Sequence, residues 1–175
     1  GDEAWPGMSD EIKVQSNSGW VLRKIIESDA EVIDFTCGSK DRGWISIKGP
    51  VQKNRGFAQL VVCRYRDVIA VMMNGHFVAQ RNMKGVQLLS SDTPVYLGPR
   101  KHGHTNRSFN GSMAFFRISK KALFRKVPFR PRVPTKPERS DVVYYDFKHL
   151  EDDILVDSSK HQRGGTAFEV KFESP

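Results

Sequence analysis

Hydrophobic and polar residues alternate with a period of two over short stretches along the first two-thirds of the chain. In Trp44-Ile45-Ser46-Ile47-Lys48, for example, Ile45 and Ile47 fall on one face of an extended strand, with Ser46 and Lys48 on the other. Turn-forming residues separate these stretches, and a helical period is almost absent. The pattern therefore predicts a chain of short antiparallel β-strands.

Ten segments have the length and composition of strands. They are residues 11–15, 20–26, 31–37, 44–48, 57–65, 67–73, 76–80, 86–89, 95–97 and 113–118. Asn74-Gly75 tolerates the positive φ angles of a type I′ turn and predicts a tight hairpin. One helical turn or two is expected from Ser119, a suitable N-cap, through Phe124. This succession predicts an all-β, two-sheet antiparallel sandwich.

The stretch over residues 94–123 carries the most specific pattern of the chain. An apolar run ends at Gly98, a polar loop follows over residues 99–108, and a strand with a Phe-x-Gly-x-apolar motif starts at Phe109 and leads to a final Ala-Leu turn. Together with the preceding hairpin, this order resembles the C-terminal half of laminin-G-like domains, which belong to the concanavalin A-like jelly-roll class with pentraxins and many lectins. The resemblance implies a jelly-roll fold and a non-catalytic, lectin-like binding module at the cell surface or outside the cell, as in cell adhesion.

The last part of the chain resembles the opening of the same kind of domain. Residues 142–147 form a strand-like run ending in an aromatic residue, followed by an acidic loop, by Asp157-Ser158-Ser159 and by Gly165-Thr166. First and last strands of a jelly roll are neighbours, so we expect residues 142–147 to pair in the same sandwich as residues 113–118 and to complete it in a permuted order. The alternative is the truncated start of a second repeat. We interpret Asp157 as a turn-former rather than a metal ligand.

The chain is expected to form one domain of 175 residues. Its body spans residues 8–125, a basic Pro/Arg-rich linker spans 126–140, and C-terminal strands over 141–172 complete the sandwich. Four prolines recur at every third position of the linker: Pro128, Pro131, Pro134 and Pro137. Such a segment favours polyproline II and cannot join a central strand.

The formal net charge of +8 is unevenly distributed, because no acidic residue occurs between Asp92 and Glu138. The basic residues taken as candidate ligand-binding residues are Arg100, Lys101, Arg107, Lys120, Lys121, Arg125, Lys126, Arg130 and Arg132. Such a block predicts an acidic partner, either a sulfated glycan of the heparin type or an acidic protein. The alternatives are a solvated face or a strap whose arginine stems pack on the sandwich. Aromatic residues are few there (Phe124 and Phe129), which argues against nucleic acid.

Signals for an enzyme or a metal site are weak. The acidic clusters at residues 27–31 and 151–153 lack the alternating spacing of glycosidase carboxylates. His102 and His104 are too few to hold a metal by themselves. Candidate calcium ligands are the side-chain oxygens of Asp67, Asn74 and Asp92, but their spacing matches no calcium-binding motif. The sequence therefore predicts no enzyme and no cofactor.

The predicted extracellular location is based on the family resemblance more than on the composition of the chain. Cys37 and Cys63 are either two buried thiols or one bridge between neighbouring strands. No apolar run reaches the roughly 18 residues of a membrane span, and residues 1–11 have no signal-peptide pattern, so no membrane insertion is expected. The alternative to an extracellular module is an intracellular scaffolding domain of a larger protein that binds other proteins.

Overall fold

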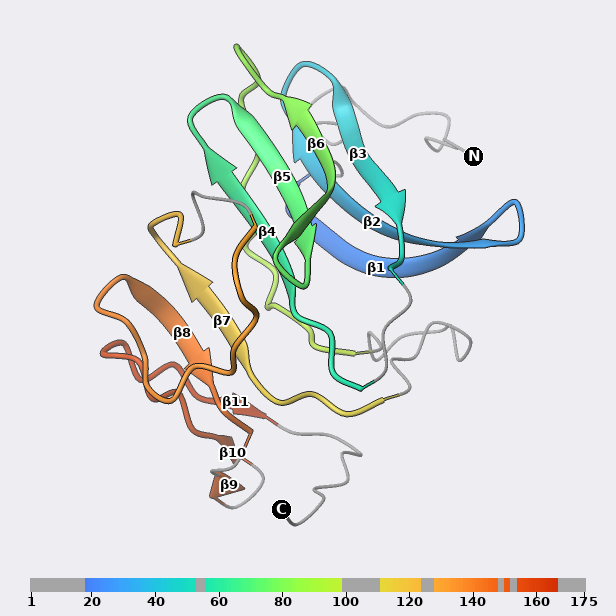
Figure 1. Ribbon diagram of the computed structural model, residues 1–175. Helices are drawn as coiled ribbons and strands as arrows, with labels where there is room; N and C mark the ends of the chain where they lie inside the picture. The colour runs from blue at the N-terminus through green and yellow to red at the C-terminus, as the bar shows by residue number, and fades with distance from the viewer. Residues whose placement is uncertain are drawn as a thin grey trace. The chain divides into compact units, whose positions relative to one another are not determined.

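The structure is a computed structural model, and it describes residues 18–52, 56–98, 111–123, 128–147, 150–151 and 154–166. Every regular element in these ranges is a β-strand, and no helix occurs in them (Figure 1). The residues group into two compact units. Unit 1 comprises residues 1–95 and 124–131, and unit 2 comprises residues 96–123 and 132–175.

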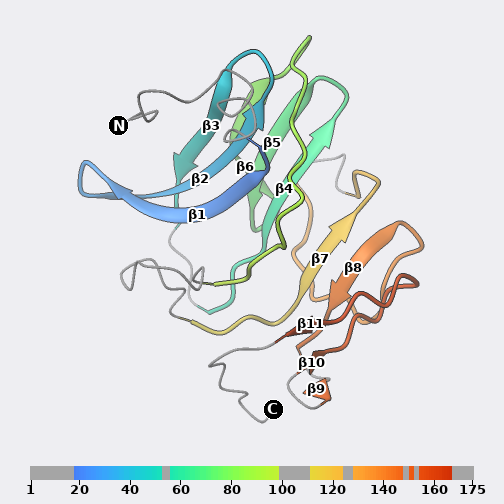
Figure 2. The same cartoon turned by 180° about the vertical axis from the view of Figure 1, so that it is seen from behind.

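Unit 1 contains two antiparallel sheets of three strands each, ordered β1-β2-β3 and β4-β5-β6. The strands are β1 (Trp20–Glu27), β2 (Ala30–Ser39), β3 (Gly43–Pro50), β4 (Leu60–Tyr65), β5 (Val68–Met73) and β6 (His76–Asn82). Figures 1 and 2 show the two sheets from opposite sides. All six strands coincide with predicted segments to within a few residues. The fold class of the prediction, an all-β antiparallel sandwich, is confirmed.

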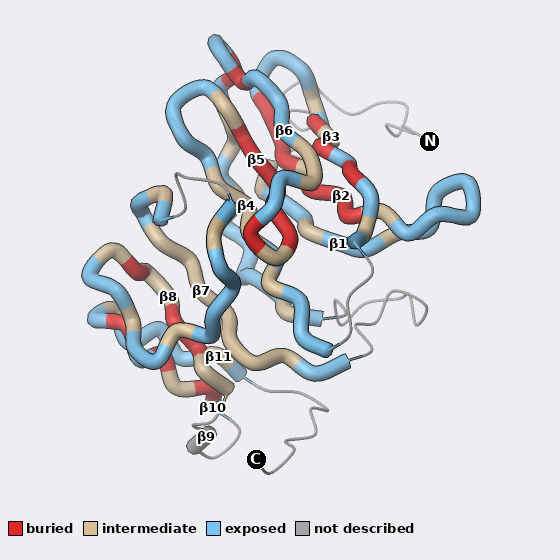
Figure 3. Tube along the Cα trace, in the orientation of Figure 1, coloured by how far each residue is buried: buried red, intermediate tan, exposed pale blue. Residues whose placement is uncertain are grey.

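The core of unit 1 lies between the facing sides of the two sheets. Its buried members are Ile33, Phe35, Cys37, Ile45, Ile47, Ile69, Val71, Met83 and Val86. As the alternation predicts, Ile45 and Ile47 of β3 are each 3% exposed, whereas Lys48 lies exposed on the other face. Burial is concentrated on β2 and β5, as the red segments of Figure 3 show. Cys37 is a buried thiol of this core and is not bridged to the half-buried Cys63.

Two-residue turns connect the β1–β2, β4–β5 and β5–β6 hairpins of unit 1, and a three-residue turn connects β2 to β3. Asn74 and Gly75 have φ angles of 51° and 83°, which confirms the predicted turn between β5 and β6. Ser28 and Asp29 likewise have positive φ angles between β1 and β2. The β1–β2 hairpin continues beyond the last pairing of β3, Val32 with Pro50, and extends away from the sheet (Figure 1).

Unit 2 contains a two-stranded sheet of β7 (Phe116–Ser119) and β8 (Asp141–Tyr145), and a second small sheet ordered β11-β10-β9. The strands of the second sheet are β9 (Leu150–Glu151), β10 (Ile154–Leu155) and β11 (Gly165–Thr166). β7 and β8 pair antiparallel, with Phe116 opposite Tyr145, so the two segments expected in one sandwich pair directly with each other.

Strand alternation also holds for the aromatic residues of β8. The ring centroid of Tyr145 lies 6.3 Å from that of Phe116 and 6.3 Å from that of Phe147, so these three side chains share one face, as the spacing of two residues between Tyr145 and Phe147 favours. Tyr144 points to the other face and is only 2% exposed. Both faces of β8 are therefore covered, which the alternation alone does not predict.

Four local predictions are wrong. Residues 86–89 form no strand and contribute only an isolated bridge between Leu88 and Ser39, and residues 95–97 are irregular. Of the strand expected over 109–118, the described residues 111–118 contribute only β7, which begins at Phe116. No helical turn follows Ser119, because this residue ends β7, and Lys120 continues the pairing by donating its backbone N–H to Ser140. The predicted segment 11–15 lies outside the described residues.

The proline-rich segment forms no strand over residues 128–137, in line with the prediction for these prolines. Within unit 1, the Phe129 amide donates to the carbonyl of Gly75 over 3.2 Å. Within unit 2, the Tyr144 hydroxyl donates to the carbonyl of Pro134 over 2.7 Å. The segment is thus fixed at two backbone positions. The assignment of residues 141–172 to a single domain with the rest of the chain stays a prediction.

Candidate functional site

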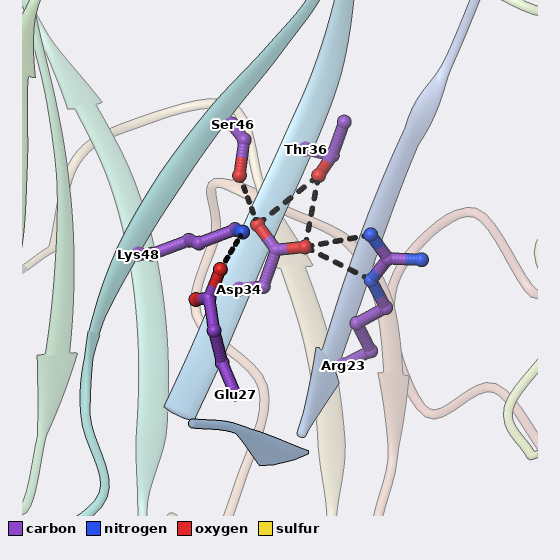
Figure 4. A network of polar contacts seen from close by, with 6 residues as sticks. All are labelled: Arg23, Glu27, Asp34, Thr36, Ser46 and Lys48. Atoms are coloured by element: carbon purple, nitrogen blue, oxygen red, sulfur yellow. Dashed lines mark hydrogen bonds and ion pairs between the residues drawn. The ribbon is translucent and has the colours of Figure 1, made fainter. Parts of the chain in front are cut away.

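A polar network around one buried carboxylate lies on the face of the β1-β2-β3 sheet that points away from the core of unit 1. Arg23 of β1 is paired with Asp34 of β2, and Ser46 of β3 is paired with Thr36, so strand alternation places all four side chains on this face. Asp34 is completely buried and is the centre of the network (Figure 4).

Asp34 accepts hydrogen bonds at both carboxylate oxygens. The Nε and Nη2 atoms of Arg23 donate to Oδ2 over 2.9 and 2.8 Å, and the hydroxyls of Ser46 and Thr36 also donate to the carboxylate. Burial opposes ionisation of Asp34, but these bonds and the charge of Arg23 outweigh it and hold the pKa of Asp34 below its ordinary value. The Asp34 carboxylate therefore positions Arg23 and stabilises the sheet. Because both of its oxygens already accept hydrogen bonds, it is not available as a general base.

The acidic cluster at residues 27–31 has a structural explanation as well. It forms the β1–β2 turn and the residues beside it, and its two glutamates lie next to lysines: Glu27 accepts from Lys48 over 2.9 Å (Figure 4), and Glu31 accepts from Lys24. All four side chains are well exposed, so these ion pairs contribute little to stability. The acidic cluster is therefore the solvent-exposed end of the β1–β2 hairpin.

The described part of the basic block consists of exposed side chains. Lys120 and Lys121 follow β7 in unit 2, Arg130 belongs to unit 1, and Arg132 belongs to unit 2. The remaining predicted binding residues lie outside the described residues: Arg100, Lys101, Arg107, Arg125 and Lys126. Of the predicted binding residues, Lys120, Lys121 and Arg132 are therefore exposed side chains of unit 2.

One basic residue of the same interval is used inside unit 2. Arg117 of β7 is only 11% exposed, and its Nε lies 3.9 Å from the buried carboxylate of Asp141. That carboxylate also accepts from the Ser119 hydroxyl and from the Glu138 amide. Arg117 thus belongs to the packing of the β7–β8 sheet and not to the exposed surface.

A turn pinned by Asp157 lies beside β8. The Asp157 carboxylate is 4% exposed and accepts from the backbone amides of Tyr144, Ser159 and Arg163 over 2.9, 2.9 and 2.7 Å. The Ser159 hydroxyl donates to it as well, over 2.9 Å. These contacts confirm the interpretation of Asp157 as a turn-former.

The electrostatics of Asp157 follow from the same contacts. Burial opposes ionisation of this carboxyl, but the bonds from the Tyr144, Arg163 and Ser159 amides outweigh it and hold the pKa of Asp157 below its ordinary value. The ionised carboxylate therefore fixes residues 158–163 against β8 at neutral pH.

This turn brings a second group of basic residues close to Lys120. The Ser159 hydroxyl donates to the carbonyl of Val142 in β8, and the Lys120 amide donates to the carbonyl of Ser140, the residue just before β8. Partial burial and the nearby charges of Lys160, Arg163 and Lys120 lower the pKa of His161, while Asp157 acts in the opposite direction. Lys120 therefore lies within electrostatic reach of the turn.

The sequence prediction missed Lys160, His161 and Arg163 as candidate binding residues. They lie outside the acid-free interval that identified the basic block, and only their position after the Asp157-Ser158-Ser159 turn could have identified them. It also missed the Asp34 network, for which the signal was a lone aspartate in the otherwise apolar run 32–37.

Metal ligands do not gather within the described ranges: no three side chains of His, Cys, Asp or Glu come together there. Of the oxygens considered for calcium, Asn74 Oδ1 accepts a hydrogen bond from the backbone N–H of Gln59 over 2.9 Å. His102 and His104 lie outside the described residues. In the part of the chain that is described, no helix is long and apolar enough to cross a membrane.

Comparison with known proteins gives the family. A laminin-G family model, described as the concanavalin A-like lectin/glucanases superfamily, matches residues 3–126. No curated protein and no solved structure matches the chain. The match covers more than half of the chain and includes both sheets of unit 1 and strand β7 of unit 2. Laminin-G-like domains generally act as non-catalytic modules that bind carbohydrate or protein. The chain therefore belongs to the laminin-G-like branch of the concanavalin A-like lectin/glucanases superfamily.

Proposed function

We propose that this domain is a non-catalytic binding module for a sulfated glycan of the heparin type, in lectin-like recognition outside the cell or at its surface. The observation that carries the proposal is the cluster of Lys120, Lys160, His161 and Arg163 at one end of the β7–β8 sheet. A repeated sulfate pattern requires several exposed cations on one surface, and this end of unit 2 supplies them.

The carboxylates near this surface support the proposal. Asp141 and Asp157 are buried, and both are engaged by hydrogen bonds within unit 2. Their charges are engaged by backbone amides and hydroxyls, so they oppose an acidic ligand less than exposed carboxylates would. Arg132 adds an exposed charge in unit 2.

The proline-rich segment combines both roles considered for it. Its backbone at Phe129 is bonded to Gly75, which supports the strap interpretation for this position. The Arg130 and Arg132 side chains are exposed nonetheless, so the strap leaves them accessible to an acidic ligand. Polyanion binding and strapping are therefore compatible.

The test is retention on immobilised heparin. A variant in which Lys120, Lys160, Arg132 and Arg163, all exposed residues of unit 2, are replaced by Ser should elute at a lower salt concentration than the unchanged chain. Attraction between exposed charges is screened within roughly 8 Å at physiological ionic strength, so the difference should shrink as salt rises. Stability should change by less than about 0.5 kcal/mol per substitution.

A matched control separates a specific surface from net charge. The control replaces four exposed residues of unit 1 by Ser: Lys40, Arg42, Arg66 and Lys84. It therefore removes as many lysines and arginines as the first variant does. We expect this control to elute close to the unchanged chain. Equal losses in both variants would show that heparin reads only the net charge, and unchanged elution of the first variant would contradict the proposed surface.

A further inference from the structure

We propose that the turn over residues 158–163 and Lys120 form one sulfate-binding site, and that an anion bound there causes His161 to take up a proton. This inference rests on the proposed function and adds to it the residues of a subsite and its regulation by pH. The affinity for a sulfated glycan would then increase as the pH falls through the range in which imidazole titrates.

The first argument is that the turn is preformed. Four hydrogen bonds to the buried carboxylate of Asp157 come from the turn and from β8, and the His161 amide donates to the Ser159 hydroxyl over 3.2 Å. Gln162 has a positive φ of 48°, which closes the turn between His161 and Arg163. A rigid backbone presents its side chains to a ligand at a lower entropic cost than a flexible loop does.

The second argument is the charge around the imidazole. On its own turn, His161 is flanked by Lys160 and Arg163, and the charge of Lys120, the residue after β7, also acts on it. The acidic group beside it is Asp157, whose carboxylate is buried and already accepts four hydrogen bonds. Three cations against one engaged carboxylate give a site that is attractive to an anion and unfavourable for a further proton.

The third argument is the thermodynamic linkage between binding of the sulfate group and binding of a proton by His161. In the free protein, partial burial and the three neighbouring cations keep the pKa of His161 below its ordinary value, so the imidazole is neutral at physiological pH. A bound sulfate adds negative charge beside the ring and raises this pKa. Binding therefore takes up a proton, and the affinity gains a factor of ten for each unit by which the bound anion raises the pKa.

The experiment is isothermal titration calorimetry of the whole chain with a heparin oligosaccharide of defined size, at constant ionic strength. We expect roughly three- to tenfold tighter binding at about pH 5.5 than at about pH 7.5. Titrations in two buffers with different ionisation enthalpies, near the midpoint of this range, should report uptake of a fraction of a proton per site. Desulfated heparin should show neither effect.

Two variants assign the proton. His161→Arg carries a permanent charge, so we expect the same affinity at both pH values and no uptake from this site. His76→Asn removes an exposed histidine of unit 1 and should keep the full uptake. Thermal unfolding of both variants checks that the fold is retained.

The outcomes separate this inference from the proposed function. If the unchanged chain does not bind heparin at either pH, the proposed function is wrong. If it binds heparin but His161→Arg shows the same proton uptake, or His76→Asn abolishes it, the proton is taken up elsewhere and only the inference is wrong. Equal uptake with desulfated heparin would overturn sulfate as the ligand group.

Discussion

The backbone at Gly75 accepts no other residue without a local change. Its φ of +83° lies in the left-handed region, and a Cβ atom built there would come within 1.8 Å of the carbonyl oxygen of Phe129. The Asn74-Gly75 pair predicts the turn from sequence, because both residues tolerate positive φ. The contact with Phe129 follows only from the path of the proline-rich segment, which is set by tertiary structure.

Replacing Gly75 by Ala should therefore cost more stability than a positive φ alone. We expect Gly85→Ala to cost about 1 kcal/mol, because its φ is +72° but no atom lies within 4 Å of the added methyl group. Gly75→Ala should cost roughly 2–4 kcal/mol, because the methyl group also displaces Phe129. Urea unfolding of the two variants measures the difference. Equal costs would show that residues 128–131 do not pack against this turn in solution.

At the scale of the element, the outer face of the β1-β2-β3 sheet shows how far the sequence determines a site. Alternation predicts the strands, and Ile33 and Phe35 predict which face of β2 lies in the core. It does not predict that Asp34, on the opposite face, is buried, because that depends on the register that places Arg23 and Ser46 beside it. The turn carrying Lys160 to Arg163 was missed for the same reason, since no local signal places it next to Lys120.

The Arg23–Asp34 contact allows a test of this sheet. Arg23→Met removes two hydrogen bonds from a buried carboxylate, and we expect a cost of about 1–2 kcal/mol at neutral pH, reduced because the Arg23 side chain is 49% exposed. The pKa of Asp34 is depressed in the folded chain, so its stabilisation is present above the unfolded pKa and lost as the pH falls through the folded pKa. The difference between variant and unchanged chain should therefore shrink in acid.

Lys24→Met is the matched control for this substitution. Lys24 is the next residue of β1, points to the other face, and pairs with Glu31 at an exposed position. Its replacement should change the free energy of unfolding by less than about 0.5 kcal/mol, with little dependence on pH. If chemical denaturation at neutral and acidic pH gave the same profile for both variants, Asp34 would not depend on Arg23.

At the scale of the whole molecule, the two compact units are interleaved along the chain. The chain passes between them after residue 95, after residue 123 and after residue 131, so neither unit is one continuous segment. The family match over residues 3–126 also includes β7 of unit 2, whose partner strand β8 lies beyond the match. Because a strand inside the family match pairs with a strand beyond it, we favour one domain completed by the C-terminal residues over the start of a second repeat.

One domain should unfold as one cooperative unit. We expect differential scanning calorimetry to give a single transition with equal calorimetric and van't Hoff enthalpies. Gly75→Ala in unit 1 and Asp157→Ala in unit 2 then serve as local reporters. The second removes the acceptor of four hydrogen bonds and should cost roughly 2–4 kcal/mol. In a single cooperative domain each variant lowers the midpoint of the whole transition. Two transitions, of which Gly75→Ala shifts one and Asp157→Ala shifts the other, would mean that residues 141–172 belong to a separately folding unit.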